Sequence, residues 1–182
     1  MTQEIKNPEE LDQVTSIVMY YFVSALNGVL GKTHLQKLIF LTDLLASKRF
    51  GQPITKMKYV RYTHGPYSKD LDSYIEKLVS SGLIEQRQFP MFSNPEHYYS
   101  RFYQKQIVDS KDFLVQAVGA EKMLLVDEVS QSYGNKSLQQ VLDFVYSLEE
   151  VKDADFDSPI KMAQEQNTSS KNEEDDEENN PF

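Results

Sequence analysis

Histidines and paired carboxylates are the side chains best suited to acid–base or metal chemistry, and this chain does not bring them together. Its three histidines, His34, His64 and His97, are scattered along the sequence. Asp70 and Asp72 stand two positions apart, a spacing that sends side chains to different faces of a helix and does not pair them. The sequence therefore predicts no catalytic residue and no metal ligand.

The sequence also lacks the motifs that usually build an active site or a cofactor pocket. There is no cysteine, which excludes thiol nucleophiles, disulfides and thiolate metal sites. No H-E-x-x-H, G-x-S-x-G, Walker or G-x-G-x-x-G pattern occurs. The 7 glycines are not clustered, so no loop is expected to cradle a phosphate. We predict a protein that is not an enzyme and has no cofactor.

A segment rich in basic and aromatic residues could bind nucleic acid. The stretch from Lys32 to Arg61 contains seven lysines and arginines and one acidic residue, Asp43. Tyr59 and Tyr62 stand among and next to these basic residues. Such a segment could contact phosphates and stack on bases. The simpler interpretation is that the lysines solubilise helix ends and a strand edge. The formal net charge of −9 and the pI of about 4.8 favour this interpretation.

A protein partner is the second kind of ligand that the residues suggest. Phe89, Met91 and Phe92 lie where a hairpin tip is predicted, and exposed apolar side chains at such a tip would mark a protein-binding site. His64 stands next to a Gly-Pro-Tyr turn. The candidate partner-binding residues are Lys56, Lys58, Tyr59, Arg61, Tyr62, His64, Tyr67, Phe89, Met91 and Phe92.

The apolar periodicity places these residues on an α+β fold that is predominantly helical. The second predicted helix is so apolar that we expect it to be central, with Thr33 as its cap and with Gly65 and Pro66 forming a later turn. The first part of the chain is predicted to form a helix that starts at Asn7-Pro8 and runs to residue 29, a helix over residues 33–50, and a helix that starts at Pro66 or Ser68 and ends at residue 80. A strand is predicted over residues 57–62.

The rest of the chain predicts a small β-hairpin followed by three further helices. The hairpin strands cover residues 83–89 and 97–107, around a loop at 90–95. A helix followed by a hairpin is winged-helix-like. The later helices are predicted over residues 109–118, 120–133 and 137–149.

The acidic charge is concentrated at the end of the chain. Residues 163–182 contain a run of acids with Lys171 as the one basic residue, and almost no hydrophobic side chains. We therefore expect a domain over residues 8–162 and a disordered acidic tail over 163–182. Such a tail is usually only a solvated terminus, but it could also mimic phosphates, screening the basic segment or binding a basic partner.

No segment predicts insertion into a membrane. The N-terminal residues lack the charged-then-apolar layout of a signal peptide, and the strongest apolar run, residues 17–23, is far shorter than a membrane span requires. We expect a cytoplasmic protein with no membrane partner.

The stretch from Lys32 to Gln86 resembles the Panacea (SocA-type) antitoxin domain, which is often phage-associated. The resemblance rests on Leu35-Gln36-Lys37-Leu38-Ile39-Phe40, on Tyr62-Thr63-His64-Gly65-Pro66-Tyr67 and on Gly82-Leu83-Ile84. It covers residues 14–150 in organisation and is specific over residues 35–84. This chain has Thr-His before Gly-Pro, where the family often has an aromatic and a basic or small residue.

The resemblance implies a toxin-neutralising antitoxin. Similar proteins bind a cognate toxin directly, and at least one branch acts as an adaptor that delivers its toxin to a protease. The Gly-Pro-Tyr residues are then expected to shape the scaffold more than to touch the partner. The alternatives are a winged-helix DNA-binding transcriptional regulator, with DNA the less favoured ligand, and a phage protein that modulates a host enzyme.

Overall fold

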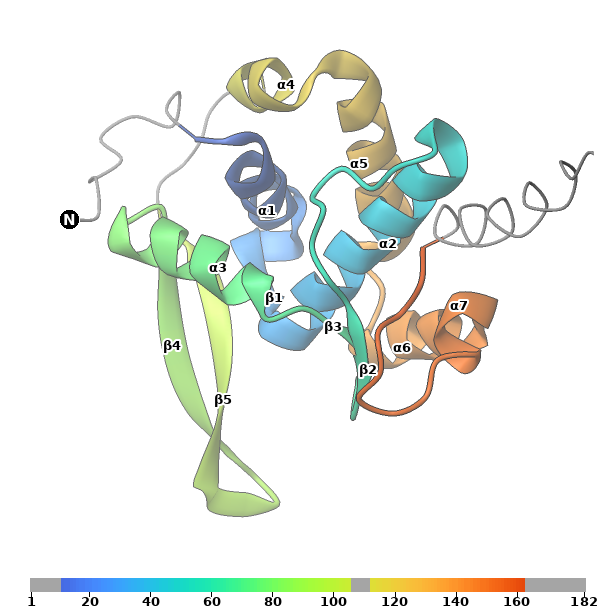
Figure 1. Cartoon of the computed structure of the whole chain (residues 1–182). Helices are drawn as coiled ribbons and strands as arrows, with labels where there is room; N and C mark the ends of the chain where they lie inside the picture. Colours follow the sequence, from blue (N-terminus) through green and yellow to red (C-terminus); the bar gives the residue numbers. More distant parts are fainter. Residues whose placement is uncertain (1–10, 106–111, 163–182) are drawn as a thin grey trace, which may run out of the picture.

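Helix α2 (Lys32–Phe50) runs through the middle of the protein in the computed structural model, which describes residues 11–105 and 112–162 (Figure 1). Its side chains are buried without a break from Leu35 to Leu44. It contacts α1 (Gln13–Ser24), α5 (Ala120–Tyr133) and α6 (Leu138–Ser147). The predicted central position of this helix is confirmed. The predicted cap is wrong, because the helix begins at Lys32 with Gly31 as its N-cap.

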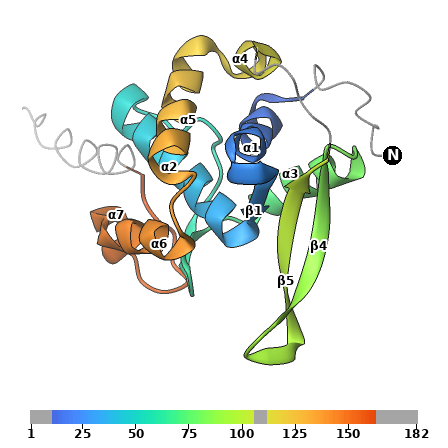
Figure 2. The same cartoon turned by 180° about the vertical axis from the view of Figure 1, so that it is seen from behind.

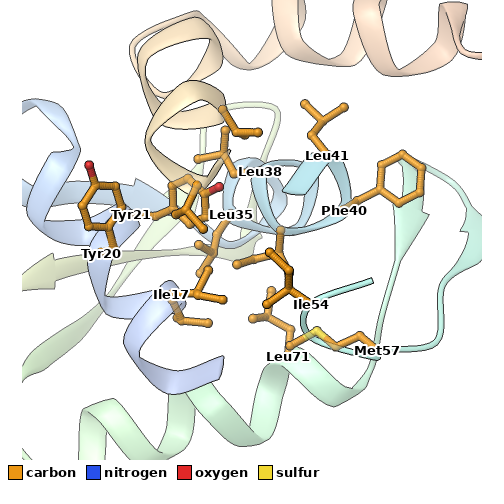
Figure 3. Close-up of a cluster of buried hydrophobic side chains, with 14 of the residues drawn as sticks. Ile17, Tyr20, Tyr21, Leu35, Leu38, Phe40, Leu41, Ile54, Met57 and Leu71 are labelled. Atoms are coloured by element: carbon orange, nitrogen blue, oxygen red, sulfur yellow. The ribbon is translucent and has the colours of Figure 1, made fainter. Parts of the chain in front are cut away.

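The core fills the space between α2, α1 and α3 (Asp70–Ser80). Figure 3 shows Ile17 of α1, Leu35 and Leu38 of α2, and Leu71 of α3 pointing toward one another, with Ile54 from the segment that follows α2. All five side chains are buried. Apolar burial on this scale is the main term that stabilises a domain of this size.

A three-stranded antiparallel sheet lies beside α1 and α2. Its order is β1 (Val29–Gly31), β5 (Asn94–Gln104) and β4 (Ile84–Met91), with Leu30 paired to Phe102. The predicted hairpin is confirmed. Its strands extend further toward the tip than predicted, so that only Phe92 and Ser93 lie between them. Strand β1 was not predicted, because three residues are too few to show an alternating pattern.

A second, small hairpin follows α2. Strand β2 (Val60–Tyr62) pairs antiparallel with β3 (Gly65–Tyr67), so the chain reverses at Thr63 and His64. The prediction of a turn at Gly65 and Pro66 is therefore wrong. These residues form a strand, in which Pro66 pairs with Arg61. Gly65 has φ +79°, which explains why a glycine stands there. Helix α3 starts at Asp70, later than both of the predicted starts, Pro66 and Ser68.

The C-terminal part of the described chain is helical and then returns to β2. Helices α4 (Asp112–Val118), α5 and α6 agree with three predicted helices, and α7 (Glu149–Lys152) adds a short turn. Figure 2 shows α6 and α7 on the side of α2 opposite the long hairpin. The chain then returns, with the N–H of Ile160 donating to the carbonyl of Tyr59 at 2.8 Å.

Some sequence predictions concern parts of the chain outside the described residues. These are the acidic tail at residues 163–182, the first residues of the domain predicted over 8–162, the end of the predicted strand 97–107 and the start of the predicted helix 109–118. As far as the structure describes the chain, none of its helices has both the length and the apolar character needed to span a lipid bilayer.

Candidate partner-binding site

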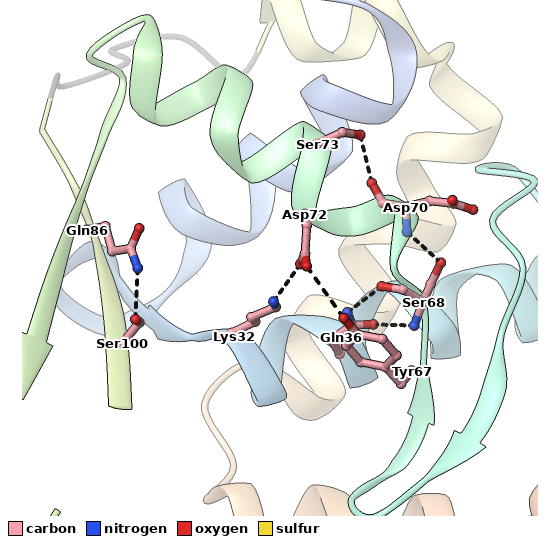
Figure 4. A network of polar contacts seen from close by, with 9 residues as sticks. All are labelled: Lys32, Gln36, Tyr67, Ser68, Asp70, Asp72, Ser73, Gln86 and Ser100. Atoms are coloured by element: carbon pink, nitrogen blue, oxygen red, sulfur yellow. Dashed lines mark hydrogen bonds and ion pairs between the residues drawn. The ribbon is translucent and has the colours of Figure 1, made fainter. Parts of the chain in front are cut away.

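Two buried polar side chains of α2 form hydrogen bonds with strand β3 and with the residue that follows it. The Gln36 amide donates to the Ser68 carbonyl at 2.7 Å, and its oxygen accepts from the Ser68 N–H at 3.0 Å (Figure 4). Next to it, Lys37 Nζ donates to the Pro66 carbonyl at 2.8 Å. Buried polar groups are costly unless they are hydrogen-bonded, so these bonds fix where β3 lies against α2. The Gln-Lys pair of the sequence motif thus holds the Gly-Pro-Tyr strand.

The ammonium of Lys37 is buried without a counter-ion among the described residues. The residue is only 2% exposed, and no described carboxylate forms an ion pair with it. Burial lowers the pKa of Lys37 from 10.5 to about 8. Desolvation disfavours the charged form of a lysine, and no nearby anion offsets that effect here.

A second buried polar cluster surrounds Asp43 on the other side of α2. Its carboxylate accepts from the Thr55 N–H at 2.8 Å, from the Thr55 hydroxyl, and from the Tyr59 hydroxyl at 2.8 Å. Burial raises the pKa of Asp43, and these hydrogen bonds oppose that rise. The cluster ties the segment after α2 to the middle of the helix.

Tyr59 belongs to this cluster and not to the protein surface. Its ring packs edge-to-face on Phe40 with 5.2 Å between the centroids, and the residue is 3% exposed. The sequence analysis placed Tyr59 among the partner-binding residues, and the structure contradicts that placement. Its alternation with basic residues reflects burial against Phe40 and Asp43.

The basic segment does not form a continuous positive surface. Lys32 pairs with Asp72 at 2.6 Å, and two other bases pair with acids of the C-terminal helices. Arg61 donates to the Ala154 carbonyl at 2.6 Å. Lys56 and Lys58 are exposed, and no ion pair to either is found among the described residues. Most of the seven basic side chains therefore form ion pairs or hydrogen bonds within this domain.

Exposed aromatic side chains gather next to β2, and we call this group the aromatic surface. Tyr62 and Phe156 are 50% and 63% exposed, and their rings stack with centroids 5.5 Å apart. The Tyr67 ring lies 6.0 Å from that of Tyr62, and the Tyr146 hydroxyl donates to the carbonyl of Thr63 at 3.1 Å. The aromatic surface consists of Tyr62, Tyr67, Tyr146 and Phe156.

Two of these four residues were not among the candidates predicted from the sequence. Tyr146 and Phe156 come from α6 and the segment after α7, far along the chain from Tyr62. No spacing rule joins residues so distant in sequence. Helix α6 brings Tyr146 there by packing against α2 and β3, and the return of the chain to β2, through backbone hydrogen bonds of residues 157–160 with Tyr59 and Arg61, brings Phe156.

A pocket of about 210 Å³ opens between the N-terminal end of α2 and the β2–β3 hairpin. We call it the α2 pocket. Three of its lining residues, Lys32, Gln36 and Tyr67, are drawn in Figure 4, where a dashed line joins Lys32 to Asp72. His64 also lines the pocket. Its lining residues are Lys32, Thr33, Gln36, Lys37, Tyr62, His64, Gly65 and Tyr67.

The tip of the long hairpin carries the remaining candidates. Phe92 is fully exposed and Met91 is partly exposed, while Phe89 stacks on Tyr99 with 5.7 Å between the centroids. In Figures 1 and 2 this tip and the β2–β3 turn point toward the same end of the molecule. Of the sequence-predicted residues, Tyr62, His64 and Tyr67 thus lie together at the β2–β3 hairpin, and Phe89, Met91 and Phe92 lie at the tip of the long hairpin. Lys56, Lys58 and Arg61 belong to neither group, and Tyr59 lies in the core.

No arrangement suited to metal binding appears in the described part of the chain, where no group of three or more histidine or acidic side chains could hold a metal ion. A pocket beside α7 is lined by four acidic side chains, Glu149, Glu150, Asp153 and Asp155, whereas the α2 pocket has basic side chains in its wall.

Comparison with known proteins gives one match. The sequence model of a family described as "Antitoxin SocA-like, Panacea domain" matches residues 35–151, which is more than half of the chain. The matched region runs from the start of the buried part of α2 to α7. Comparison with curated proteins finds no match, and comparison with solved structures finds none either.

Proposed function

Because this chain belongs to the SocA-like antitoxin family with a Panacea domain, we propose that it neutralises a cognate protein toxin by binding it directly. The observation that carries the proposal is the set of exposed aromatic side chains at one end of the molecule. Phe92 stands fully in solvent, and Tyr62 and Phe156 stack on each other at the surface.

Exposed aromatic residues of this kind supply most of the binding energy at protein interfaces. Large rings bury much area at a small cost in side-chain entropy, and they dominate the residues whose loss weakens a complex. The long hairpin holds Phe92 and Met91 away from the body of the protein (Figure 1). A toxin could therefore contact the hairpin tip and the aromatic surface together, because both lie toward the same end.

DNA binding is the alternative that the order of elements suggests. Helix α1, strand β1, helices α2 and α3, and the β4–β5 hairpin occur in the order of a winged-helix domain, with the β2–β3 hairpin inserted between α2 and α3. In such domains the helix before the hairpin usually contacts DNA. Here that helix is α3, which carries Asp70, Asp72 and Glu76 against one lysine, Lys77.

The charge on α3 disfavours contact with a phosphate backbone. Asp70 and Glu76 are exposed, and Lys77 is paired with Asp12 at 2.5 Å. DNA-binding surfaces gain affinity by neutralising phosphates with lysine and arginine. An acidic helix at this position would repel DNA, so we favour a protein partner over a promoter.

A co-expression assay tests the proposed function. The product of the gene next to this one is expressed alone and together with the chain, and growth is followed. We expect a toxic neighbour whose effect the chain suppresses. The double variant Met91→Ser/Phe92→Ser should suppress less well at equal protein levels. Leu124→Ser, which changes an exposed apolar residue of α5, is the matched control.

A neighbour that is harmless alone, or toxic without rescue by the chain, would contradict the proposal. Equal loss of rescue in the hairpin variant and in the Leu124→Ser control would contradict the placement of the contact surface.

A further inference from the structure

The α2 pocket is lined by basic titratable groups and by no acidic one. Lys32, Lys37 and His64 line it, together with two tyrosine rings. The nearest carboxylate that the contacts identify is Asp72, which pairs with Lys32 at 2.6 Å and accepts from the Tyr67 hydroxyl at 3.4 Å. Asp72 thus compensates Lys32, and no described carboxylate is left to pair with Lys37.

The uncompensated charge of Lys37 is the unusual feature of this pocket. An ammonium can donate three hydrogen bonds, and Lys37 donates one, to the Pro66 carbonyl. Buried charges in proteins are normally paired, because desolvation is otherwise costly. A buried cation with spare donors in the wall of a pocket is what an anion-binding site requires.

The N-terminal end of α2 adds to the positive potential. The helix is 19 residues long, no side-chain hydrogen bond caps this end, and no acid stands in its first turn. Aligned peptide dipoles favour negative charge at such an end. Thr33 and Gln36 of the first turns lie in the pocket wall beside Lys37.

The size and surroundings of the pocket favour one carboxylate over a nucleic acid. A volume of about 210 Å³ and walls formed by Tyr62 and Tyr67 suit a single side chain. The pocket is close to the aromatic surface, where Asp155 and Asp157 flank Phe156 in the sequence and are exposed. These acids would repel a chain of phosphates, whereas a segment with one carboxylate among apolar residues would fit.

We propose that the α2 pocket receives a glutamate or aspartate side chain of the protein partner, whose apolar neighbours pack on the aromatic surface. The carboxylate bonds to Lys37 and His64, and the stacked pair of Tyr62 and Phe156 covers the adjacent apolar side chains. The inference names the chemistry of the partner and rests on the proposed function, but the site can be tested without that partner.

The test uses a small probe with the full chain. N-acetyl-glutamate amide is titrated into isotope-labelled protein and followed by NMR, with N-acetyl-glutamine amide as the neutral probe of the same shape. We expect saturable shifts at Gly65, His64 and Lys37 with the glutamate probe alone. Lys37→Met should weaken binding about tenfold or more, the effect of one charge-assisted hydrogen bond. Lys56→Met, an exposed lysine outside the pocket, should bind as the unchanged protein does.

Several outcomes would overturn the inference. Equal shifts with both probes would show that charge is not recognised, and the absence of saturable shifts would show that no site exists. Tighter binding of inorganic phosphate would assign the pocket to a phosphate ligand. If a chain shortened after Met162 bound the probe more strongly than the full chain, the acidic tail would be the occupant of the pocket.

The two probes are compared on the unchanged protein, so the test does not depend on the folding of Lys37→Met. Loss of toxin neutralisation in the co-expression assay would not affect the probe result. Failure of the proposed function and failure of this site can therefore be told apart.

Discussion

The buried ammonium of Lys37 makes a measurable prediction about stability and pH. In the unfolded chain Lys37 has its ordinary pKa of 10.5 and stays protonated up to pH 9, whereas burial lowers the pKa to about 8 in the folded chain. Between these values the folded protein binds fewer protons than the unfolded one. The free energy of unfolding must therefore rise with pH in this range.

The size of the effect follows from the two pKa values. Integrating the difference in bound protons from pH 7 to pH 9 gives a gain of about 1.4 kcal/mol from Lys37 alone, since one pKa unit corresponds to about 1.4 kcal/mol. The range ends at pH 9 because burial raises the pKa of Tyr21 and Tyr59 well above that of an ordinary tyrosine. Ionisation of these tyrosines in the unfolded chain would lower stability at higher pH.

Urea denaturation at pH 7, 8 and 9 measures the effect. The protein should gain stability relative to Lys37→Met by about 1.4 kcal/mol across this range, because methionine has no proton to release. Lys56→Met, which removes an exposed lysine, should show the same pH dependence as the unchanged protein. A stability difference between the protein and Lys37→Met that does not vary with pH would refute the uncompensated burial of Lys37.

Three further substitutions test the scaffold and the surface. Gly65→Ala should cost about 1 kcal/mol in urea denaturation, because a φ of +79° is unfavourable for a residue with a Cβ. Asp43→Asn should cost about 1–3 kcal/mol in thermal denaturation, because its amide N–H groups would face the donors of Thr55 and Tyr59. Phe92→Ser should change the free energy of unfolding by less than about 0.5 kcal/mol, since the ring is fully exposed. The same variant should lower affinity for the toxin about tenfold or more in a calorimetric titration, and an unchanged affinity would contradict the role of the hairpin tip.

Hydrophobic periodicity was sufficient to predict most helices and the long hairpin. Helix α2 shows why, because an apolar sequence around Leu38 leaves no face that could be exposed. The β2–β3 hairpin shows where the method fails. Glycine and proline at positions 65 and 66 indicate a turn by their local preferences, but the Lys37–Pro66 hydrogen bond holds them in a strand. That bond joins residues 29 positions apart, which no local rule detects.

The candidate site was predictable only in part, for a similar reason. The sequence identified Tyr62, His64, Tyr67 and the hairpin tip, which carry their own aromatic or apolar signal. It could not show that ion pairs with distant acids neutralise much of the basic segment, nor that Phe156 returns to stack on Tyr62. Pairing and burial depend on tertiary contacts, so charge counted along the sequence overstates the charge at the surface.

Direct binding to a toxin is the central claim, and a calorimetric titration of the purified chain with the toxic product of its neighbouring gene tests it most directly. We expect a saturable complex with a dissociation constant of about 1 μM or tighter, as stable recognition between proteins requires. We expect that affinity to fall in Met91→Ser/Phe92→Ser and to be unchanged in Leu124→Ser. The account would be contradicted if the chain showed no binding to the toxin in this titration and bound the promoter DNA of its own gene tightly and sequence-specifically.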